Sequence, residues 1–365
     1  MGTVKELTRV KHPVVFYAES RHYFQYFNNL ITGLLASGIP IIYITSDKSD
    51  PLLSNAPKGM RVVHIHWMLG HLLNHLHAEV VIMTMPDLGN FLFKRSNNVG
   101  HYIYMFHAAV STHQQYREHA FDNYDVIFAT GEYQVSEIRA AEEVRGLREK
   151  PMVPYGYPLF DEIATRVNDR GVTDTRQPAI LIAPSWFAGC IFDTCLEELM
   201  ERLAKLPYRI LLRSHPEYEK RKKKEFRHIT GKIARYSNME IDRSPNVMDV
   251  LAMVDTVITD RSGIAFEFAF GTKRPVIFIE TSLKENNPNW RTLGIDPIEN
   301  SLRKELGVIV DPTKLDQIGV ALEELQQMQA PFPSRIDNLF EENFFNPASS
   351  FDPGLQYVLG KLKKA

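Results

Sequence analysis

The sequence predicts an α/β protein made of two doubly wound domains, each with a mostly parallel sheet covered by helices. Three observations lead to this fold class. Short apolar runs of strand length alternate with helical segments between residues 14 and 144, and the same alternation restarts at residue 179. The length of 365 residues suits two domains of common size. We expect two Rossmann-like domains that face each other across a cleft, with ligands at the carboxyl ends of the strands.

The first domain is predicted over residues 1–160. Its helices are expected at 23–38, where apolar residues recur at helical spacing before Gly38, and at 133–144. Its strands are the short apolar runs 14–19, 39–46, 61–66, 78–84, 101–107 and 125–131. Strands separated by crossover helices favour a parallel sheet.

Residues 150–175 are predicted to link the domains, because they combine prolines, glycine and polar residues. The second domain is predicted over 175–345, and 346–365 as a C-terminal helical tail. From about residue 314 the chain looks helical, with interruptions at Pro331 and Pro333. The expected helices of the second domain are 193–206, 247–254 and 263–271, and its expected strands are 179–185, 208–212, 238–244, 255–260, 274–280 and 307–311.

Composition excludes several classes of protein. The net charge of -2 gives no overall attraction to nucleic acid. Two cysteines are too few for a disulfide framework or a zinc site, so we expect a cytoplasmic protein with no protein-held metal. The amino terminus has no signal-peptide core, and no apolar run approaches the ~20 residues of a membrane span. Any membrane contact is therefore expected to be peripheral.

The segment DTVITDRSGIAFEF carries the strongest candidate site. A strand ends at Asp260, and Arg261, Ser262 and Gly263 lead into a helix. The first turn of a helix has free N–H groups and the positive end of the dipole, which suit a phosphate. Glu267 follows Ser262 by five residues, about 7 Å along the helix axis. We expect these residues to bind a nucleotide donor, with Glu267 at the ribose.

The segment RSHP is the second candidate. Pro216 restricts His215 to an extended conformation, so its imidazole is expected to project from the end of a strand. Arg213 lies two residues earlier, on the same side of an extended chain. An arginine and a histidine placed in this way suit phosphate oxygens.

Further candidates lie at other strand ends. His107 ends a strand of the first domain and is suited to act as a base near neutral pH, with His113 as the next choice. Ser185, in APSW, ends the first strand of the second domain. The first strand–helix turn holds three residues that suit an acceptor, and they are Ser20, Arg21 and His22. Taken singly, each segment is also compatible with an ordinary capped helix or surface loop.

Five segments in order resemble the CDP-glycerol glycerophosphotransferase family of teichoic-acid and capsule synthesis. They are His107-Ala108, YGYPLFD at 155–161, APSW at 183–186, RSHP at 213–216 and DTVITDRSGIAFEFAFGTKRPVIFIE at 255–280. Ala108, Ser214 and the Arg261–Gly263 stretch depart from the family pattern. The resemblance implies the GT-B architecture, with an acceptor domain followed by a nucleotide-donor domain.

The resemblance also implies a reaction. CDP-glycerol or a related donor would bind the second domain through Ser185, Arg213, His215, Asp260 to Gly263 and Glu267. His107 would act as base on an acceptor hydroxyl, and CMP would leave. The acceptor would be a lipid-linked or polysaccharide polymer at the inner face of the cytoplasmic membrane. The basic run KRKKK, 220–224, suits anionic lipid or a polyanionic acceptor but is also typical of a solvated face.

Three alternatives remain open at this point. One is a nucleotide-sugar-dependent glycosyltransferase on the same scaffold. Another is a UDP-sugar 2-epimerase, because SGIAFE (262–267) resembles the helix start of that family. The third is a non-catalytic protein that binds a polyanion. The products distinguish the four hypotheses. CMP with a phosphodiester supports the glycerophosphotransferase, and a glycosidic bond supports the glycosyltransferase. An altered nucleotide sugar supports the epimerase, and binding without turnover supports the polyanion-binding protein.

Overall fold

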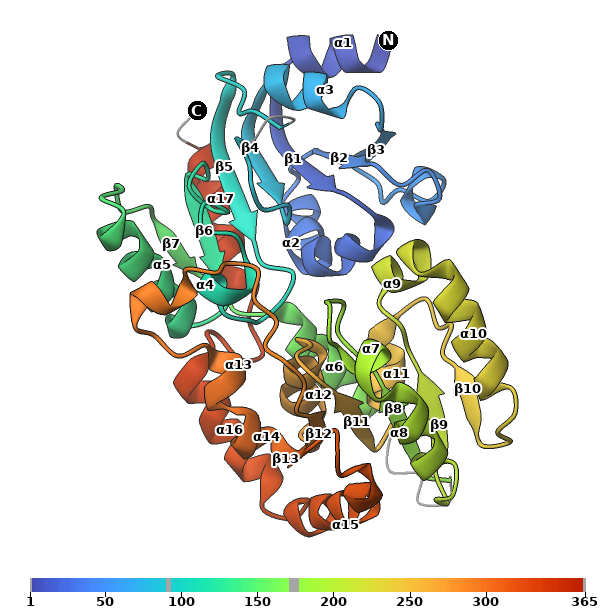
Figure 1. Cartoon of the computed structure of the whole chain (residues 1–365). Coiled ribbons are helices and arrows are strands. Elements are labelled where there is room, and N and C mark those ends of the chain that lie inside the picture. Colours follow the sequence, from blue (N-terminus) through green and yellow to red (C-terminus); the bar gives the residue numbers. More distant parts are fainter. Residues whose placement is uncertain (1, 90–92, 171–176, 364–365) are drawn as a thin grey trace. The chain divides into compact units, whose positions relative to one another are not determined.

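The computed structural model describes residues 2–89, 93–170 and 177–363 (Figure 1). The chain forms two compact units. Unit 1 comprises Met1–Pro158, Asn286–Ile295 and Asn343–Ala365, and unit 2 comprises Leu159–Glu285 and Asp296–Glu342. Each unit contains one sheet of parallel strands with helices on its faces, as the sequence predicts for an α/β fold.

Unit 1 has a seven-stranded sheet in the order β3-β2-β1-β4-β5-β6-β7. The pairs are parallel throughout, with β1 between β2 and β4. After β1 the chain adds β2 and β3 on one side of that strand. It then returns to add β4 to β7 on the other side. The strands are β1 (His12–Ala18), β2 (Ile41–Thr45), β3 (Met60–His64), β4 (Ala78–Met83), β5 (Val99–Met105), β6 (Val126–Ala129) and β7 (Met152–Pro154).

The two faces of this sheet have separate cores, because successive side chains of a strand point to opposite faces. Val15 and Tyr17 pack on the face covered by α1 (Gly2–Arg9), α3 (Leu69–His75) and α5 (Glu132–Val144). Val14 and Phe16 pack on the other face with α2 (Phe24–Ala36) and α17 (Asp352–Leu362). Figure 1 shows α17, in red, beside this sheet although it comes from the end of the chain. Shorter helices of unit 1 are η1 (Arg21–Tyr23), η2 (Pro51–Leu53), α4 (Thr112–Gln115) and η3 (Trp290–Leu293).

Unit 2 has a six-stranded parallel sheet in the order β10-β9-β8-β11-β12-β13. This is the doubly wound order, with the reversal between β8 and β11. The strands are β8 (Ala179–Ile182), β9 (Arg209–Leu212), β10 (Met239–Ile241), β11 (Thr256–Thr259), β12 (Val276–Ile279) and β13 (Gly307–Val310).

The helices of unit 2 also cover both faces of its sheet. Ile180 and Ile182 of β8 pack with α8 (Leu196–Leu203), α10 (Lys223–Ile233) and α15 (Ile318–Met328). The opposite face meets α12 (Ile264–Thr272), which contacts α11 (Val247–Met253). The other helices of unit 2 are α6 (Pro158–Arg170, shared with the end of unit 1), α7 (Ile191–Thr194), α9 (Pro216–Arg221), α13 (Ile298–Ser301), α14 (Arg303–Leu306), η4 (Leu315–Gln317) and α16 (Phe332–Asn343).

The segment expected as a linker is instead ordered structure. Residues 152–154 form β7, an edge strand, where Pro154 is tolerated because its missing N–H faces no partner strand. Pro158 begins α6, where its fixed φ suits the first turn. Residues 171–176, at the end of the predicted linker, lie outside the described residues.

The chain leaves unit 2 after Glu342, close to the boundary predicted at residue 345, and returns to unit 1 instead of forming a separate tail. Helix α16 packs in unit 2, where Phe340 lies against Phe160, while α17 packs in unit 1. Helix α15 ends at Met328 and α16 begins at Phe332, so the helical run is interrupted next to Pro331 as expected, and Pro333 lies in the first turn of the new helix. Asn286–Ile295 also leaves unit 2 to pack in unit 1, a crossing that no feature of the sequence indicated.

Candidate functional site

The reversal of strand order in unit 2 brings candidate residues together at the carboxyl ends of neighbouring strands. Because β8 lies between β9 and β11, the ends of these three strands are neighbours. Ser185 follows β8, Arg213 follows β9, and Ser262 follows β11. Neighbouring strands lie about 4.8 Å apart, so roughly 10 Å separates the axes of the outer two. Ligands of doubly wound sheets bind at this reversal.

Asp260 organises this edge from inside the protein. It is fully buried, and its Oδ1 accepts hydrogen bonds from the backbone N–H groups of Ser185, at 2.8 Å, and Arg261, at 2.7 Å. Its Oδ2 accepts from the N–H of Ile191 at 2.9 Å. The carboxylate therefore joins the loop after β8 to the turn before α12. The sequence predicted that Asp260 binds the nucleotide donor. In the structure both of its carboxylate oxygens accept hydrogen bonds from backbone N–H groups.

Two buried arginines lie beside Asp260. Arg261 pairs with Glu280 and donates to the carbonyl of Thr281 at 3.1 Å. Arg303 donates to the carbonyl of Asp260 at 2.7 Å and to Glu280 at 3.1 Å, and its guanidinium lies over the ring of Phe278. Burial, reinforced by the neighbouring Arg261, lowers the pKa of Arg303 to about 10. Both side chains line a hollow with Ser262 and Phe266.

The start of α12 is accessible next to this cluster. The helix begins at Ile264 with Gly263 as its N-cap, and the hydroxyl of Ser262 accepts from the N–H of Ile264 at a long 3.4 Å. Ser262, Gly263 and Glu267 are each partly exposed. The hydroxyl of Ser185 is buried and has no hydrogen-bond partner among the described residues. The N–H groups of Ala265 and Phe266 donate to the carbonyls of Ser262 and Gly263, so this helix start suits an anion through its dipole and the nearby Ser262 and Ser185 hydroxyls.

Arg213 and His215 are held in defined orientations. The guanidinium of Arg213 pairs with Asp242, whose side chain is 4% exposed, and donates to the carbonyl of Ser244 at 3.1 Å. His215 is extended, with φ -64° and ψ 137°, as its proline neighbour predicted. Its Nδ1 accepts the N–H of Glu217 at 3.2 Å, so in the neutral ring the proton lies on Nε2. The exposed imidazole can therefore donate a hydrogen bond through Nε2.

In unit 1, His107 lies in a cage of tyrosines just after β5. Its ring makes edge contacts with Tyr23 at 5.3 Å, Tyr26 at 6.1 Å and Tyr116 at 6.1 Å between centroids. The hydroxyl of Tyr157 donates to the His107 carbonyl at 3.3 Å. The tyrosines thus fix the position and plane of a partly exposed imidazole.

The YGYP segment supplies Tyr157. Gly156 adopts φ +87°, a left-handed conformation, and a Cβ there would lie 2.5 Å from the carbonyl oxygen of Phe345. Glycine is therefore required for the turn that leads from β7 to the buried Tyr157. The YGYP segment therefore contacts the candidate base through the backbone carbonyl of His107, which accepts a hydrogen bond from Tyr157.

The turn after β1 lies at the same edge of unit 1. Arg21 donates to the carbonyl of Ser49 at 3.4 Å, and its backbone N–H donates to Asp47 at 3.4 Å. Ser20 is the N-cap of η1, His22 is exposed, and Tyr23 next to them contacts His107. The structure therefore brings the predicted acceptor turn and His107 together within unit 1.

His113 differs from the other candidates because it is buried. Its Nδ1 lies 3.3 Å from Glu137 and its Nε2 3.0 Å from the carbonyl oxygen of Ile295. Asn287 donates to the His113 carbonyl at 2.9 Å. His113 therefore joins α4 to the crossing segment Asn286–Ile295. Its predicted role at the acceptor stays a prediction.

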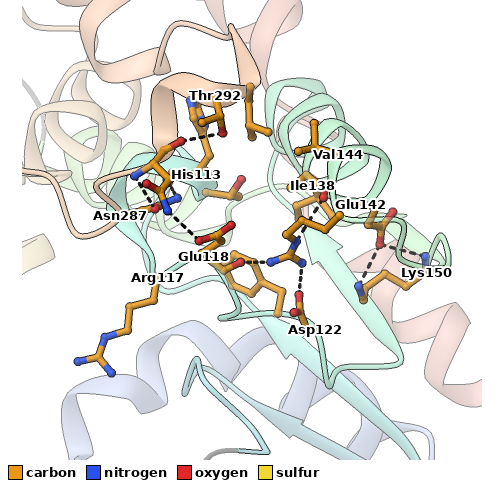
Figure 2. Close-up of a pocket in the computed structure, with 16 residues that line it drawn as sticks. His113, Arg117, Glu118, Asp122, Ile138, Glu142, Val144, Lys150, Asn287 and Thr292 are labelled. Atoms are coloured by element: carbon orange, nitrogen blue, oxygen red, sulfur yellow. Dashed lines mark hydrogen bonds and ion pairs between the residues drawn. The ribbon is translucent and has the colours of Figure 1, made fainter.

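Figure 2 shows a pocket beside His113, between residues 112–122, α5 and the crossing segment. Four of its charged side chains are paired with one another: Arg145 with Asp122, and Lys150 with Glu142 at 2.9 Å. Glu118 accepts a hydrogen bond from Asn289 at 3.1 Å, and the exposed Arg117 lies 3.8 Å from Asp87. Phe121, Ile138 and Leu293 add apolar lining. Because these paired charges are neutralised within the protein, the pocket is better explained as part of the packing between α4, α5 and the crossing segment than as an anion site.

Several partners of the candidates were not found from the sequence. Asp242 and Arg303 are single charged residues outside any motif. Their partners lie at the ends of other strands of the sheet, and strand neighbours cannot be read from the order of residues in the sequence. Tyr23 and Tyr157 had a signal, since both lie next to segments that the sequence singled out. In the described ranges no group of three or more His, Cys, Asp and Glu residues is arranged to hold a metal. The described helices include none with the length and apolarity needed to cross a bilayer.

The sequence matches the model of one protein family over residues 7–300, described as CDP-glycerol:poly(glycerophosphate) glycerophosphotransferase. No curated protein matches it. Among solved structures, a chain of the wall teichoic acid polymerase TagF is similar with a TM-score of 0.61 and 16% identity, over 96% of this chain and 89% of that chain.

Two other structures are also similar. The UDP-GlcNAc 2-epimerase of Methanocaldococcus jannaschii, in complex with UDP-GlcNAc and UDP, has a TM-score of 0.63 and 13% identity over 96% of this chain and 100% of its own. WaaG, a glycosyltransferase involved in lipopolysaccharide biosynthesis, has a TM-score of 0.53 and 13% identity over 95% of this chain and 100% of its own. At these identities the likeness concerns the fold alone, and it confirms the predicted GT-B class.

Proposed function

The chain belongs to the CDP-glycerol:poly(glycerophosphate) glycerophosphotransferase family, and from this premise we propose that it transfers glycerol phosphate from CDP-glycerol to a hydroxyl of a teichoic-acid or capsule polymer. It is a transferase of the CDP-glycerol glycerophosphotransferase type. The observation that carries the proposal is the convergence of Ser185, Arg213, His215 and the Ser262–Gly263 turn at the strand reversal of unit 2.

We assign donor binding to unit 2. Helix α12 offers its first turn to the diphosphate, and Glu267 lies within that turn to accept from ribose hydroxyls. Arg213 and the Nε2–H of His215 donate to phosphate oxygens from the neighbouring strand end. Asp260 and Arg261 act as positioning residues, because their side chains bind within the protein. A TagF structure soaked with CDPG is consistent with a donor of this kind.

We assign acceptor activation to unit 1. An acceptor hydroxyl loses its proton to the imidazole of His107 and its oxygen attacks the β-phosphorus of CDP-glycerol. The bond from that phosphorus to the bridging oxygen breaks and CMP leaves, so one phosphodiester forms for each CMP released. Ser20, Arg21 and His22 contribute to acceptor binding beside Tyr23. Most of the acceleration comes from positioning and charge stabilisation.

The proposal places the reaction on the cytoplasmic side, where nucleotide donors are made, with the polymer at the inner face of the membrane. It requires no metal held by the protein. A chelator is therefore expected to leave turnover unchanged when the donor carries no bound cation.

Thermal stabilisation tests the donor class. CDP-glycerol at about 100 times its dissociation constant should stabilise the protein by about 2.7 kcal/mol, whereas UDP-sugars should not. Arg213→Ala should reduce the shift, and the exposed Arg235→Ala serves as a matched control. Stabilisation by UDP-GlcNAc alone would favour an epimerase or a glycosyltransferase and would refute the proposal.

Product analysis tests the reaction and the histidines. Wild-type protein should release CMP and form a phosphodiester, and His107→Ala and His215→Ala should each lower kcat by about 10²-fold or more. The exposed His228→Ala controls for loss of a surface histidine. A glycosidic product would refute the proposal, and wild-type kcat in either variant would remove that residue's role.

A further inference from the structure

Helices α9 and α10 of unit 2 carry a strongly basic exposed surface. Residues 216–235 contain eight lysines and arginines but three glutamates, a net charge of +5 in a chain whose net charge is -2. The apolar side of both helices is buried in the core through Tyr218, Phe226, Ile229 and Ile233. The positive charge is therefore collected on the solvent side.

Part of this charge has no counterion among the residues that the structure describes. Arg221 pairs with Glu217 at 2.6 Å, and Lys222 lies 4.0 Å from Glu225. In contrast, Lys223, Lys224 and Arg227 have no ion pair within the described residues, and all three are exposed. We call these three residues the α10 basic face. Lys224 and Arg227 lie opposite the buried stripe of the helix, so they point to solvent.

Helix stability does not explain the α10 basic face. Lys223 and Lys224 lie in the first turn of α10, where positive side chains oppose the helix dipole. Lys223 and Arg227 are four residues apart, and a like-charged pair at that spacing repels. An external anion would relieve both effects. Local preferences that are broken without compensation are typical of functional surfaces.

The position of the surface points to its ligand. Helix α9 begins at Pro216, directly after Arg213 and His215, so the basic helices continue the chain from the proposed phosphate site. No large apolar residue is exposed between residues 216 and 235, where the structure describes every residue. Surfaces that insert into membranes combine basic with apolar side chains. A purely charged face is better suited to a hydrophilic polyanion.

We propose that the α10 basic face binds phosphates of the anionic polyol-phosphate polymer that the enzyme extends. The inference rests on the proposed function and adds a polymer-binding surface outside the reacting groups. Because the attraction is electrostatic, polymer affinity depends on salt and on the number of phosphates per chain. A single-unit acceptor spans too few phosphates to use the surface.

The test compares two triple variants of the full chain. K223Q/K224Q/R227Q removes the α10 basic face, and K205Q/K304Q/K314Q removes the same charge from exposed lysines elsewhere in unit 2. Glutamine keeps the helix propensity of lysine and arginine. Binding of fluorescently labelled poly(glycerol phosphate) is measured without donor at several salt concentrations, together with binding of phosphatidylglycerol vesicles.

We expect K223Q/K224Q/R227Q to bind the polymer about tenfold or more weakly. The slope of log affinity against log salt should fall by about 2, since each contact to a flexible strand contributes roughly 0.7. CMP release with a single-unit acceptor should stay at the wild-type rate in both variants. Equal polymer affinity in the two triple variants would overturn the inference. So would loss of vesicle binding with polymer binding retained.

The two proposals fail in different ways. If CDP-glycerol is not the donor, CMP release is absent from every protein, while polymer binding is still measured because that assay contains no donor. If only the polymer surface is wrong, CMP release persists and the polymer affinities of the two triple variants coincide.

Discussion

Replacing Asp260 by asparagine tests whether this carboxylate organises the edge of the unit 2 sheet. In the wild type, two backbone N–H groups donate to Oδ1 and that of Ile191 donates to Oδ2. The amide oxygen of asparagine can keep the two donors at Oδ1, but its NH₂ group then faces the N–H of Ile191. One buried donor loses its partner, which costs about 1–3 kcal/mol, and the two remaining bonds are no longer charge-assisted. The expected total is about 3 kcal/mol.

Trp186 provides the assay, because it follows Ser185 in the loop that Asp260 holds. The chain has three tryptophans, so replacing Trp67 and Trp290 by phenylalanine leaves Trp186 as the single reporter. With a urea m-value of about 2 kcal/mol/M, Asp260→Asn should lower the unfolding midpoint by about 1.5 M. The matched control is Asp255→Asn at the other end of the strand, where the carboxylate accepts the N–H of Ala179 at 2.8 Å, and it should lower the midpoint less than Asp260→Asn. Equal midpoints for the two variants would refute this account of Asp260.

Three further perturbations test the supports of unit 1. Tyr157→Phe removes the donor to the His107 carbonyl and should lower kcat several-fold while costing about 1 kcal/mol of stability; an unchanged kcat would separate Tyr157 from catalysis. Asn287→Ala removes a buried hydrogen bond to the His113 carbonyl and should destabilise unit 1 by about 1–3 kcal/mol in a denaturation curve, whereas the exposed Asn289→Ala should cost much less. Gly156→Ala forces a left-handed alanine against a carbonyl oxygen and should destabilise by about 1–3 kcal/mol; a melting temperature equal to the wild type would contradict the strain.

The class of the fold was accessible from the sequence because parallel strands buried on both faces leave continuous apolar runs. The runs at 14–19 and 179–185 coincide closely with β1 and β8. The short strand β7 escaped prediction, because Pro154 within it, Pro151 just before it and the nearby Gly156 are typical of loops. Its parallel pairing with β6 overrides that local preference, at an edge where a proline is tolerated.

The positions of the candidates were predictable to the level of strand ends. His107, Arg213 and Ser262 each follow a strand, as expected from where apolar runs stop. What each side chain contacts was not predictable, because contacts depend on strand order. Nothing local in the sequence indicates that Asp260 binds the loop after β8, 75 residues earlier. The burial of His113 likewise depends on a segment 182 residues away.

The crossing of Asn286–Ile295 into unit 1, with α17 returning there as well, affects how this enzyme can be divided. Each unit is assembled from separated stretches of chain. A fragment ending at Pro158 would lack Val358, which is buried in the core of unit 1. It would also lack Ile295, whose carbonyl oxygen lies 3.0 Å from Nε2 of His113. Chimaeras that exchange whole halves between relatives at one junction would therefore pair mismatched pieces. Grafts that swap the three stretches of unit 1 together would keep each core intact.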